Sequence, residues 1–408
     1  MIGEKILCGL DVGTRQMKAS LVKAKRPDQW ELIATHELPT RGLRKSQVND
    51  LSEFSESVHD TLRDLSKKSG AKIKDVQLGI GGELVTSRFS RAMIPLLDKS
   101  SKIVTQGDIK KINKQARLLG VKMEEEILHD FPQHYVLDDT NKVLTPLSLY
   151  GRKLGVMSLL IVAPTNPLGN IHKAVQQAGY EIAHIFFSSF VCAQASLTDD
   201  ARQNGCLLID MGANTTNILF FKDGFLRHLD IIPLGGDHFT GSIAQALQLP
   251  FELAEDIKKS HASVLSEDIH SSGEILIKKD EGYMSIKRKV IYESIEPQVA
   301  RFIDDLQNTL RFSHIVEKLN SGAVMIGGGA LLPGLIERVE KALGIHVSMG
   351  KPNMDTTAFN NASVFTAAIG LAQAGLNTSL PHIFSVNASR GWLGNFSNRI
   401  KELYEEYF

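Results

Sequence analysis

Two segments far apart in the chain repeat one short pattern: an apolar run, an aspartate, one further residue, a glycine and then hydroxyl or amide side chains. They are residues 7–18 (LCGLDVGTRQMK) and 206–217 (CLLIDMGANTTN), in which Asp11 corresponds to Asp210 and Gly13 to Gly212. Another apolar segment follows each copy, so each predicts a β-hairpin with a carboxylate and a glycine at its tip. Two ordinary tight turns are the alternative, but the repetition in both halves of the chain favours a shared site.

The backbone at such a tip has a specific use. Successive N–H groups in a tight turn form a concavity that binds anions. Two hairpins facing each other would hold a polyphosphate from both sides, with Asp11 and Asp210 directed at its Mg²⁺. Magnesium usually keeps waters and takes one or two carboxylates besides the phosphates.

Composition narrows the class of protein. A chain of 408 residues predicts two or more domains, and 43% hydrophobic with 23% charged residues is typical of a soluble globular protein. The formal net charge of +0 gives no electrostatic reason to expect nucleic acid as a partner. Cys8, Cys192 and Cys206 show no Cys-x-x-Cys spacing, which favours free thiols in a reducing compartment. No secretory signal pattern opens the chain, and no apolar run approaches the roughly 18 residues that span a bilayer.

Strand and helix patterns alternate along the chain, which predicts an α/β fold in layers. The expected strands are residues 6–38 around the first hairpin, 76–80, 126–131, 134–137, 159–162, those of the second hairpin, 230–234, 274–277 and 323–326. The expected helices are residues 52–69, 105–119, 170–178, 240–247, 251–259, 290–318, 335–343 and 363–374. The helix at 240–247 is expected to begin with free backbone N–H groups.

Two further features are candidates for ligand contacts. Three glycines follow an apolar strand at residues 327–329, where the lack of side chains lets backbone approach a ligand; a plain strand-to-helix turn is the alternative. Glu255 and Lys258 lie one helical turn apart, where they would meet ribose hydroxyls and a base or phosphate; a solvated ion pair is the alternative. The chain has no Walker A loop, nucleophile elbow or Cys/His metal spacing, so no catalytic residue is predicted.

Taken in order, the two hairpins, Ala254-Glu255-x-x-Lys258 and Gly-Gly-Gly-Ala330 resemble the actin/Hsp70/sugar-kinase superfamily. Within it, the chain is most similar to the FtsA family of bacterial cell-division proteins, through residues 128–138 (LHDFPQHYVLD), Gly151-Arg152-x-Leu154, residues 235–240 (GGDHFT) and 295–297 (IEP). The resemblance covers essentially the whole chain. It implies an α/β, actin-like (ribonuclease H-like) two-lobed fold with an inserted α+β subdomain and a C-terminal amphipathic helix.

The resemblance also implies a division of the chain. Lobe 1 (subdomain 1A) would comprise residues 1–82 and 166–204, interrupted by the inserted subdomain 1C at 83–165. Subdomain 2A would comprise 205–234 and 321–360, with 2B at 235–320. A helix at 361–375 would return to lobe 1, followed by a flexible tether at 376–390 and a membrane-targeting helix at 391–408.

ATP with Mg²⁺ is the ligand that the resemblance implies. The nucleotide-binding residues it implies are Asp11, Gly13, Thr14, Arg15, Lys18, Asp210, Gly212, Asn214, Thr215, Thr216, Asn217, Gly235, Gly236, Glu255, Lys258, Gly327, Gly328, Gly329 and Ala330. Asp11 and Asp210 would hold the metal through water.

The second hairpin departs from the family's usual Asp-Ile-Gly-Gly-Gly-Thr-Thr-Asp. Ala213 and Asn214 replace two glycines, and their Cβ atoms restrict close approach and positive φ. Asn217 replaces the final aspartate, which weakens metal positioning, and Ser242 stands where the family often has Asp. ATP binding with weak or absent ATPase activity is therefore expected.

The end of the chain carries an aromatic and aliphatic stripe at helical spacing. Its members are Trp392, Leu393, Phe396, Ile400, Leu403, Tyr404, Tyr407 and Phe408. Such a stripe after a polar tether predicts an interfacial membrane anchor, although docking on the protein's own body is the alternative. Three glutamates in this segment offset Arg399 and Lys401, so apolar burial rather than charge would carry the binding.

The resemblance implies a function as well. The expected protein polymerises on the cytoplasmic face of the inner membrane at the division septum and anchors the FtsZ ring there. Its expected partners are the FtsZ C-terminal peptide, bound near residues 290–318, other copies of itself, lipids and further division proteins, but not nucleic acid. The alternative is a PilM-like type IV pilus assembly protein that binds a membrane-protein peptide. The C-terminal stripe favours the first, and no sugar-site carboxylate motif supports a sugar kinase.

Overall fold

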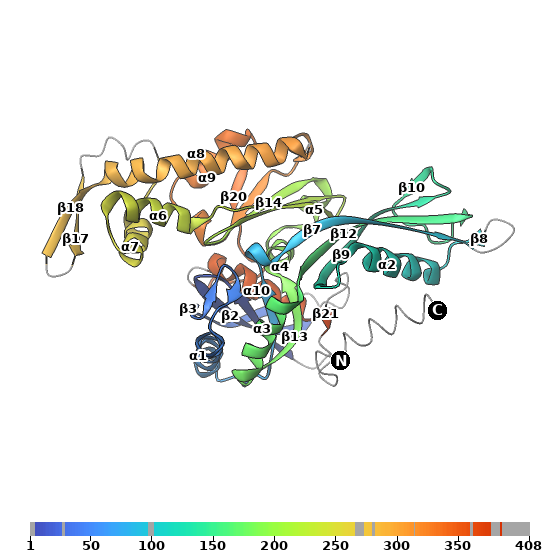
Figure 1. Ribbon diagram of the computed structural model, residues 1–408, viewed down its shortest axis with the longest axis horizontal. Coiled ribbons are helices and arrows are strands. Elements are labelled where there is room, and N and C mark those ends of the chain that lie inside the picture. Colours follow the sequence, from blue (N-terminus) through green and yellow to red (C-terminus); the bar gives the residue numbers. More distant parts are fainter. Residues whose placement is uncertain are drawn as a thin grey trace.

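Two α/β lobes lie one above the other, and an elongated third part projects sideways from between them (Figure 1). This computed structural model describes residues 5–26, 29–96, 102–265, 273–279, 282–313, 315–359, 362–376 and 384–385. The membrane helix expected at 391–408 and most of the tether expected at 376–390 lie outside the described residues. None of the helices in the described part is long and apolar enough to cross a bilayer.

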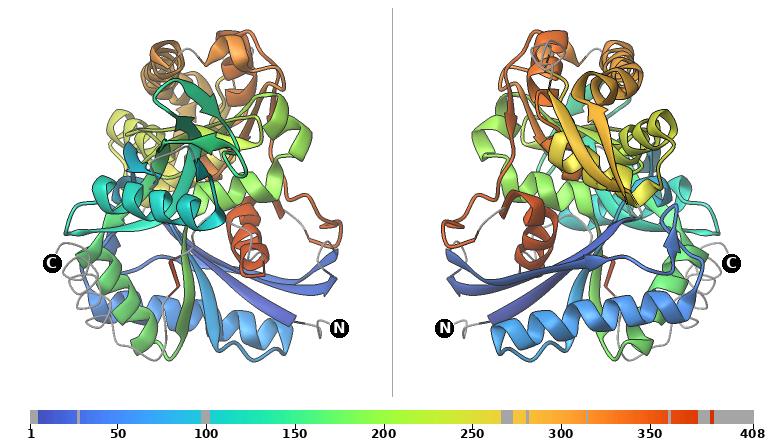
Figure 2. Two further views of the ribbon diagram at one scale, coloured as in Figure 1. Left: turned by 90° about the vertical axis from the view of Figure 1, so that its right-hand side faces the viewer. Right: turned by 90° about the vertical axis from the view of Figure 1, so that its left-hand side faces the viewer.

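Lobe 1 is built on a six-stranded sheet in the order β21-β13-β6-β1-β2-β3. Its strands are β1 (Lys5–Val12), β2 (Gln16–Arg26), β3 (Gln29–Pro39), β6 (Asp75–Ile80), β13 (Glu181–Phe187) and β21 (Phe384–Ser385). Helices α1 (Leu51–Ser69) and α3 (Thr165–Gln177) pack on one face, and α4 (Ser188–Ser196) and α10 (Thr366–Ala374) on the other. Figure 2 shows this sheet lying between α1 and α10.

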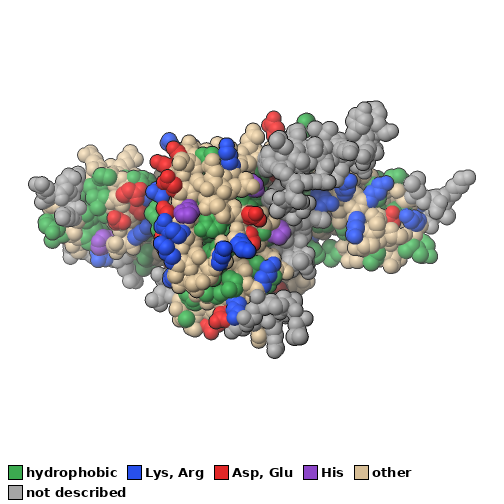
Figure 3. Space-filling view, turned by 90° about the horizontal axis from the view of Figure 1, so that it is seen from below, with side chains coloured by type: hydrophobic (Ala, Val, Ile, Leu, Met, Phe, Trp, Pro, Cys, Tyr) green, Lys and Arg blue, Asp and Glu red, His purple; other side chains and the backbone are tan. Residues whose placement is uncertain are grey.

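Helix α1 follows directly from its sequence. Phe54, Val58 and Leu62 recur at helical spacing and are all fully buried. The Asp50 side chain accepts a hydrogen bond from the N–H of Glu53 at its start, and Gly70 ends it in a left-handed conformation. Its outer face is polar, and Figure 3, which views the molecule from the side of α1 and α3, shows basic and acidic side chains interspersed there.

Lobe 2 has a five-stranded sheet in the order β16-β15-β14-β19-β20. Its strands are β14 (Cys206–Met211), β15 (Thr216–Lys222), β16 (Phe225–Ile232), β19 (Ala323–Ile326) and β20 (Val347–Met349). The helices of this half are α5 (Asp199–Asn204), α6 (Gly236–Leu247), α7 (Phe251–His261), α8 (Arg288–Phe312) and α9 (Leu335–Leu343). A separate hairpin, β17 (Glu274–Lys279) with β18 (Gly282–Lys287), extends beyond α7 (Figure 1).

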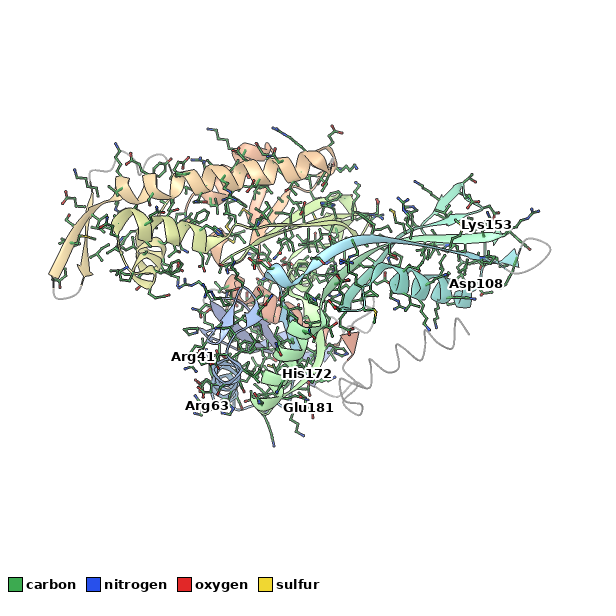
Figure 4. All side chains as sticks on the ribbon, viewed as in Figure 1. Arg41, Arg63, Asp108, Lys153, His172 and Glu181 are labelled. Atoms are coloured by element: carbon green, nitrogen blue, oxygen red, sulfur yellow. The ribbon has the colours of Figure 1, made fainter. Side chains whose placement is uncertain are left out.

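The projecting part is a four-stranded antiparallel sheet with one helix packed on it. The sheet order is β10-β9-β12-β7, formed by β7 (Thr86–Pro95), β9 (Glu125–Leu137), β10 (Asn141–Val143) and β12 (Lys153–Pro164). Helix α2 (Gln106–Gly120) begins with a capping box between Thr105 and Asp108. Asp108 and Lys153 mark the outer end of this part, far from Arg63 of α1 and from Arg41 in the loop before it (Figure 4).

The two long strands β9 and β12 join this projection to lobe 1. Their inner ends contribute Leu128, Phe131 and Ile161 to a large core that fills lobe 1 and continues onto the strands of lobe 2. Their outer ends contribute Tyr135 and Leu154 to a small separate core beneath α2. The projection therefore has packing of its own but is continuous with lobe 1.

Several expected elements need correction. The strands expected at 126–131 and 134–137 form one strand, β9, because Pro132 is accommodated at a β-bulge opposite Ser158. Helix α3 begins at Thr165 rather than at residue 170, since Pro167 lies in its first turn, where no N–H partner is needed. Helix α8 ends at Phe312 rather than at 318, and the helix expected at 363–374 begins as a 3₁₀ turn, Ala362–Phe365.

The small core beneath α2 predicts that the projecting part can be destabilised independently of lobe 2. Ile112 of α2 is fully buried in the core of the projection, and its truncation to alanine should cost about 2–5 kcal/mol there. Hydrogen exchange of Ile112→Ala should therefore rise in α2, β7 and the outer half of β9, with α8 unaffected. Phe302→Ala, in the core of lobe 2, is the matched control and should show the reverse pattern. A uniform rise in both variants would mean that the chain unfolds as one unit.

Candidate functional site

The two lobes build their hairpins in the same way. Asp11 pairs with Lys18 across β1 and β2 and lies beside Gly79 of the parallel strand β6. Asp210 pairs with Asn217 across β14 and β15 and lies beside Ile326 of the parallel strand β19. Both carboxylates therefore sit at the carboxyl end of a central strand, which is where open α/β sheets bind ligands.

Two consecutive serines at the start of α4 hold both carboxylates. Ser188 Oγ donates a hydrogen bond of 2.6 Å to Asp11 Oδ1, and Ser189 Oγ donates one of 2.6 Å to Asp210 Oδ2. Asn217 Nδ2 donates to Ser189 Oγ over 2.9 Å. One helix start thus brings together three predicted residues from both hairpins. The sequence analysis missed the serines; their signal is a Ser-Ser pair directly after the apolar strand β13.

The carboxyls of Asp11 and Asp210 are both withdrawn from water. Burial raises the pKa of Asp11, against hydrogen bonding from Ser188 and the charge of Lys18. Burial, with a smaller contribution from the charge of Asp11, raises the pKa of Asp210 to about 6 against its bond from Ser189. Within the described part of the chain, the buried Asn217 Oδ1 has no hydrogen-bond partner. Two desolvated carboxyls with a spare amide oxygen fit a hydrated dication such as Mg²⁺, which would use Asp11 and Asp210 and neutralise phosphate charge.

Glycine is required beside each aspartate. Gly327 has φ +92°, and a Cβ there would lie 2.9 Å from Asp210 Oδ1 and 2.3 Å from the carbonyl oxygen of Met211. A Cβ on Gly79 would lie 2.5 Å from Ser188 Oγ and 3.2 Å from Asp11 Oδ1. Any larger residue would displace the groups that hold the carboxylates.

The second hairpin tip leans on the start of α6. The N–H of Gly236 donates to the carbonyl of Gly212 over 2.9 Å, and the N–H of Asp237 donates to that of Ala213 over 2.8 Å. The expectation of free N–H groups at a helix starting near residue 240 is therefore wrong, because α6 begins at Gly236 and its first N–H groups are bonded. Neither Ala213 nor Asn214 adopts positive φ, so the tip tolerates their Cβ atoms without strain in the left-handed region.

Glu255 and Lys258 form a partly buried network rather than a solvated pair. Lys258 Nζ lies 2.7 Å from Glu255 Oε2 and donates to the carbonyl of Gly236 over 2.9 Å and to Thr240 Oγ1 over 2.8 Å. Burial lowers the pKa of Lys258, with the Glu255 carboxylate acting against it. A Cβ on Gly236 would lie 3.4 Å from Lys258 Nζ and 3.6 Å from Gly329 Cα, so these predicted residues do converge.

Arg15 joins the lobes across the site. From the first hairpin it donates 2.9 Å to Glu252 Oε2 and lies 3.4 Å from Asp237 Oδ1, and its guanidinium stacks 4.8 Å from the centre of the Phe251 ring. Arg15 was predicted to bind nucleotide, whereas its contacts here are with α6 and α7. Asp237 and Glu252 were not predicted, because sequence spacing does not indicate ion pairs between residues so far apart in the chain, 222 positions for Arg15 with Asp237 and 237 for Arg15 with Glu252.

The remaining predicted residues lie on the same elements. Gly13 and Thr14 form the first hairpin tip, where Thr40 Oγ1 donates to the Gly13 carbonyl over 2.8 Å. Thr216 is buried and donates to the carbonyl of Leu234, so its hydroxyl is committed to the fold. Thr215 lies at the second tip, and Gly328 and Ala330 lie in the 3₁₀ turn Gly328–Leu331. Contact of any of these residues with nucleotide stays a prediction.

Comparison with models of known protein families shows to which family this chain belongs. The family model described as "Cell division protein FtsA" matches residues 207–370, and the model described as "SHS2 domain inserted in FTSA" matches residues 82–162. The chain belongs to the FtsA family. The cell division protein FtsA of Pseudomonas aeruginosa is 27% identical over 91% of this chain and 89% of that protein. That of Escherichia coli is 28% identical over 92% of this chain and 91% of that protein.

Solved structures show the same actin-like fold outside the FtsA family. The PilM–PilN type IV pilus biogenesis complex matches with a TM-score of 0.64 and 18% identity, covering 90% of this chain and 98% of the matched chain. MreB5 of Spiroplasma citri bound to ADP matches with a TM-score of 0.52 and 14% identity, covering 92% and 97% of the two chains. The actin-like fold expected from the sequence is confirmed. PilM shares that fold, while the family models and sequence relatives place this chain with FtsA.

The raised pKa of Asp210 predicts the pH dependence of stability. The stability that the neutral Asp210 carboxyl contributes is fully present below its ordinary pKa of 3.8, and it is lost as the pH rises through the folded-state pKa of about 6. The free energy of unfolding of Asp210→Asn at pH 8 should therefore exceed that of wild type by on the order of 1 kcal/mol, after allowance for solvent screening. The variant should accordingly unfold at a higher temperature. The gain should vanish by pH 4.

The exposed Asp138 provides a control of opposite sign. Backbone hydrogen bonds from the N–H groups of Arg152 and Lys153 lower its pKa. Asp138→Asn should therefore lower the melting temperature at pH 8, with the loss shrinking as pH falls. If Asp210→Asn behaves like Asp138→Asn, the carboxyl of Asp210 is not destabilised by burial.

Proposed function

We propose that this chain binds Mg²⁺ and ATP between its lobes and acts as an actin-like cell-division protein. The observation that carries the proposal is the pair of hairpins whose aspartates, Asp11 and Asp210, are held by adjacent serines of one helix. Glycines border both carboxylates, because a Cβ at Gly79 or Gly327 would displace the groups that hold them. Membership of the FtsA family supplies the cellular process.

Nucleotide acts here as a ligand more than as a substrate. Asn217 stands where the family pattern has a carboxylate, and its amide nitrogen donates a hydrogen bond to Ser189. The site therefore lacks one charged group that would position metal and water. The lobes are joined by Arg15, Glu252 and Asp237, whose contacts a bound polyphosphate would change. A ligand shifts a conformational equilibrium by its differential affinity, which suffices for a nucleotide-controlled assembly without rapid turnover.

The first test is nucleotide affinity. Calorimetry should show that Asp11→Ala and Asp210→Ala each lower the affinity for Mg·ATP at least about tenfold, because each removes a carboxylate that would face the metal. The loss should shrink when chelator replaces Mg²⁺. Phosphate release by wild type should be weak or undetectable. Unchanged affinity in both variants would sink the two-hairpin site, and rapid phosphate release abolished by Asp210→Ala would overturn the proposal of weak hydrolysis.

On the membrane, we propose that residues 391–408 anchor the chain to the inner face of the inner membrane. Family membership supports three further proposals: the protein polymerises there, the projecting subdomain contacts the next copy, and the C-terminal peptide of FtsZ binds lobe 2 near α8. The aromatic stripe supports the anchor, since amphipathic helices of this kind bury their apolar face in the bilayer interface.

Co-sedimentation with vesicles tests the anchor and the FtsZ link together. Wild type with ATP should pellet with vesicles and carry a labelled FtsZ C-terminal peptide with it, and added salt should matter little. Trp392→Glu with Phe396→Glu should leave both in the supernatant without altering ATP affinity, since charges cannot enter the apolar interface. Ser379→Glu with His382→Glu, in the tether, is the matched control and should still pellet. The anchor is refuted if wild type stays soluble or if both double variants pellet alike.

A further inference from the structure

Strand β9 of the projecting subdomain makes hydrogen bonds into both lobes. His129 Nε2 accepts from the backbone N–H of Phe187 over 3.0 Å. Further along the strand, Gln133 Nε2 donates to the carbonyl of Leu226 in β16 over 2.9 Å, and Arg227 donates to the Gln133 carbonyl over 2.9 Å. Gln133 is the extra residue of the bulge beside Pro132, and such bulges re-aim a side chain. The strand therefore contacts the end of β13 in lobe 1 and the edge of the lobe 2 sheet.

The histidine is an unusual choice for its surroundings. His129 is fully buried, with its ring centre 4.8 Å from that of Phe190 and 5.8 Å from that of Phe131. Because Nε2 accepts, the neutral ring carries its proton on Nδ1, and Nδ1 has no hydrogen-bond partner among the described residues. A phenylalanine would fill this aromatic pocket without leaving a buried N–H unsatisfied. What histidine adds is the acceptor for Phe187.

That acceptor acts at the point where the site is assembled. Phe187 ends β13 and is the cap residue of α4, and no side chain caps the start of this helix. The next two residues are Ser188 and Ser189, which hold Asp11 and Asp210 at 2.6 Å each. The two serines reach opposite hairpins, so a small rotation at Phe187 would move one or both hydroxyls out of range.

We propose that His129 is a positioning residue for the nucleotide site. Its bond to Phe187 sets the junction of β13 and α4 so that both serines meet their aspartates, and it ties that geometry to the projecting subdomain through β9. The inference rests on the proposed nucleotide function for its effect on affinity, but its structural part can be measured without any ligand. The bond is a physical link between the site and the subdomain that carries β9, and a coupling of this kind acts in both directions.

His129→Phe and His129→Gln test the proposal on the full chain. The first keeps an aromatic ring but removes the acceptor; the second offers an amide oxygen at a similar reach. Hydrogen exchange without nucleotide should rise about tenfold in peptides spanning residues 185–192 of His129→Phe, and Mg·ATP affinity should fall about tenfold, as for the loss of one buried hydrogen bond. His129→Gln should stay within about threefold of wild type in both measurements.

Tyr135→Phe is the matched control. Tyr135 lies in the same strand, β9, and this variant removes the hydrogen bond of 3.0 Å that Asn113 of α2 donates to its hydroxyl. Because that bond lies in the projecting subdomain, away from α4 and the hairpins, the variant should change neither readout. The inference is overturned if exchange at 185–192 is unchanged in His129→Phe, or if Tyr135→Phe raises it equally. It is also overturned if wild type binds Mg·ATP and His129→Phe binds it as tightly. Failure of wild type to bind Mg·ATP would refute the proposed function instead, and the exchange measurement would still decide whether His129 orders the serines.

Discussion

The hydrogen bonds from Ser188 and Ser189 to Asp11 and Asp210 are the contacts on which the site depends. Two carboxyls that come from different sheets and are withdrawn from water do not remain close together without partners. Adjacent residues at the start of one helix supply those partners, and each reaches the hairpin of a different lobe. The separation of the hairpins is therefore determined where β13 passes into α4, and any change in the relative position of the lobes must strain or release the bond between Ser189 and Asp210.

The fold places that junction through duplication. Each lobe has a hairpin, a neighbouring parallel strand and a glycine turn at the end of that strand, so both aspartates come to equivalent sheet ends. Contacts between the lobes add to this frame. Arg15 reaches α6 and α7 from the first hairpin, and β9 of the projecting subdomain bonds to both lobes. The three parts are thus connected through hydrogen bonds near the hairpins, while the outer half of the projection depends on its own small core.

The buried carboxyls of Asp11 and Asp210 give an electrostatic reason for this site to bind a magnesium nucleotide. Buried carboxyls with raised pKa values destabilise the protein at neutral pH, and a dication bound beside them would relieve that cost. The altered second hairpin is compatible with this view, since neither Ala213 nor Asn214 has a positive φ, and the carbonyls of Gly212 and Ala213 accept hydrogen bonds from the start of α6. Asn217 places an uncharged amide at this tip, which would weaken the positioning of metal and water more than the binding of nucleotide.

Local pattern was enough to predict the hairpins, the amphipathic helices such as α1 and α2, and the glycines at strand ends, because each depends on residues a few positions apart. It also supplied Asp11 and Asp210, whereas the actin-like fold was expected only from the resemblance to a known family. Pattern could not supply Ser188, Ser189 or the partners of Arg15, since their roles arise only when sheets far apart in the chain are packed together. It misjudged the start of α6 for the same reason: whether a helix N–H is free depends on the loop that packs against it. Residue order thus determined which groups the site contains, and tertiary packing decided which of them meet.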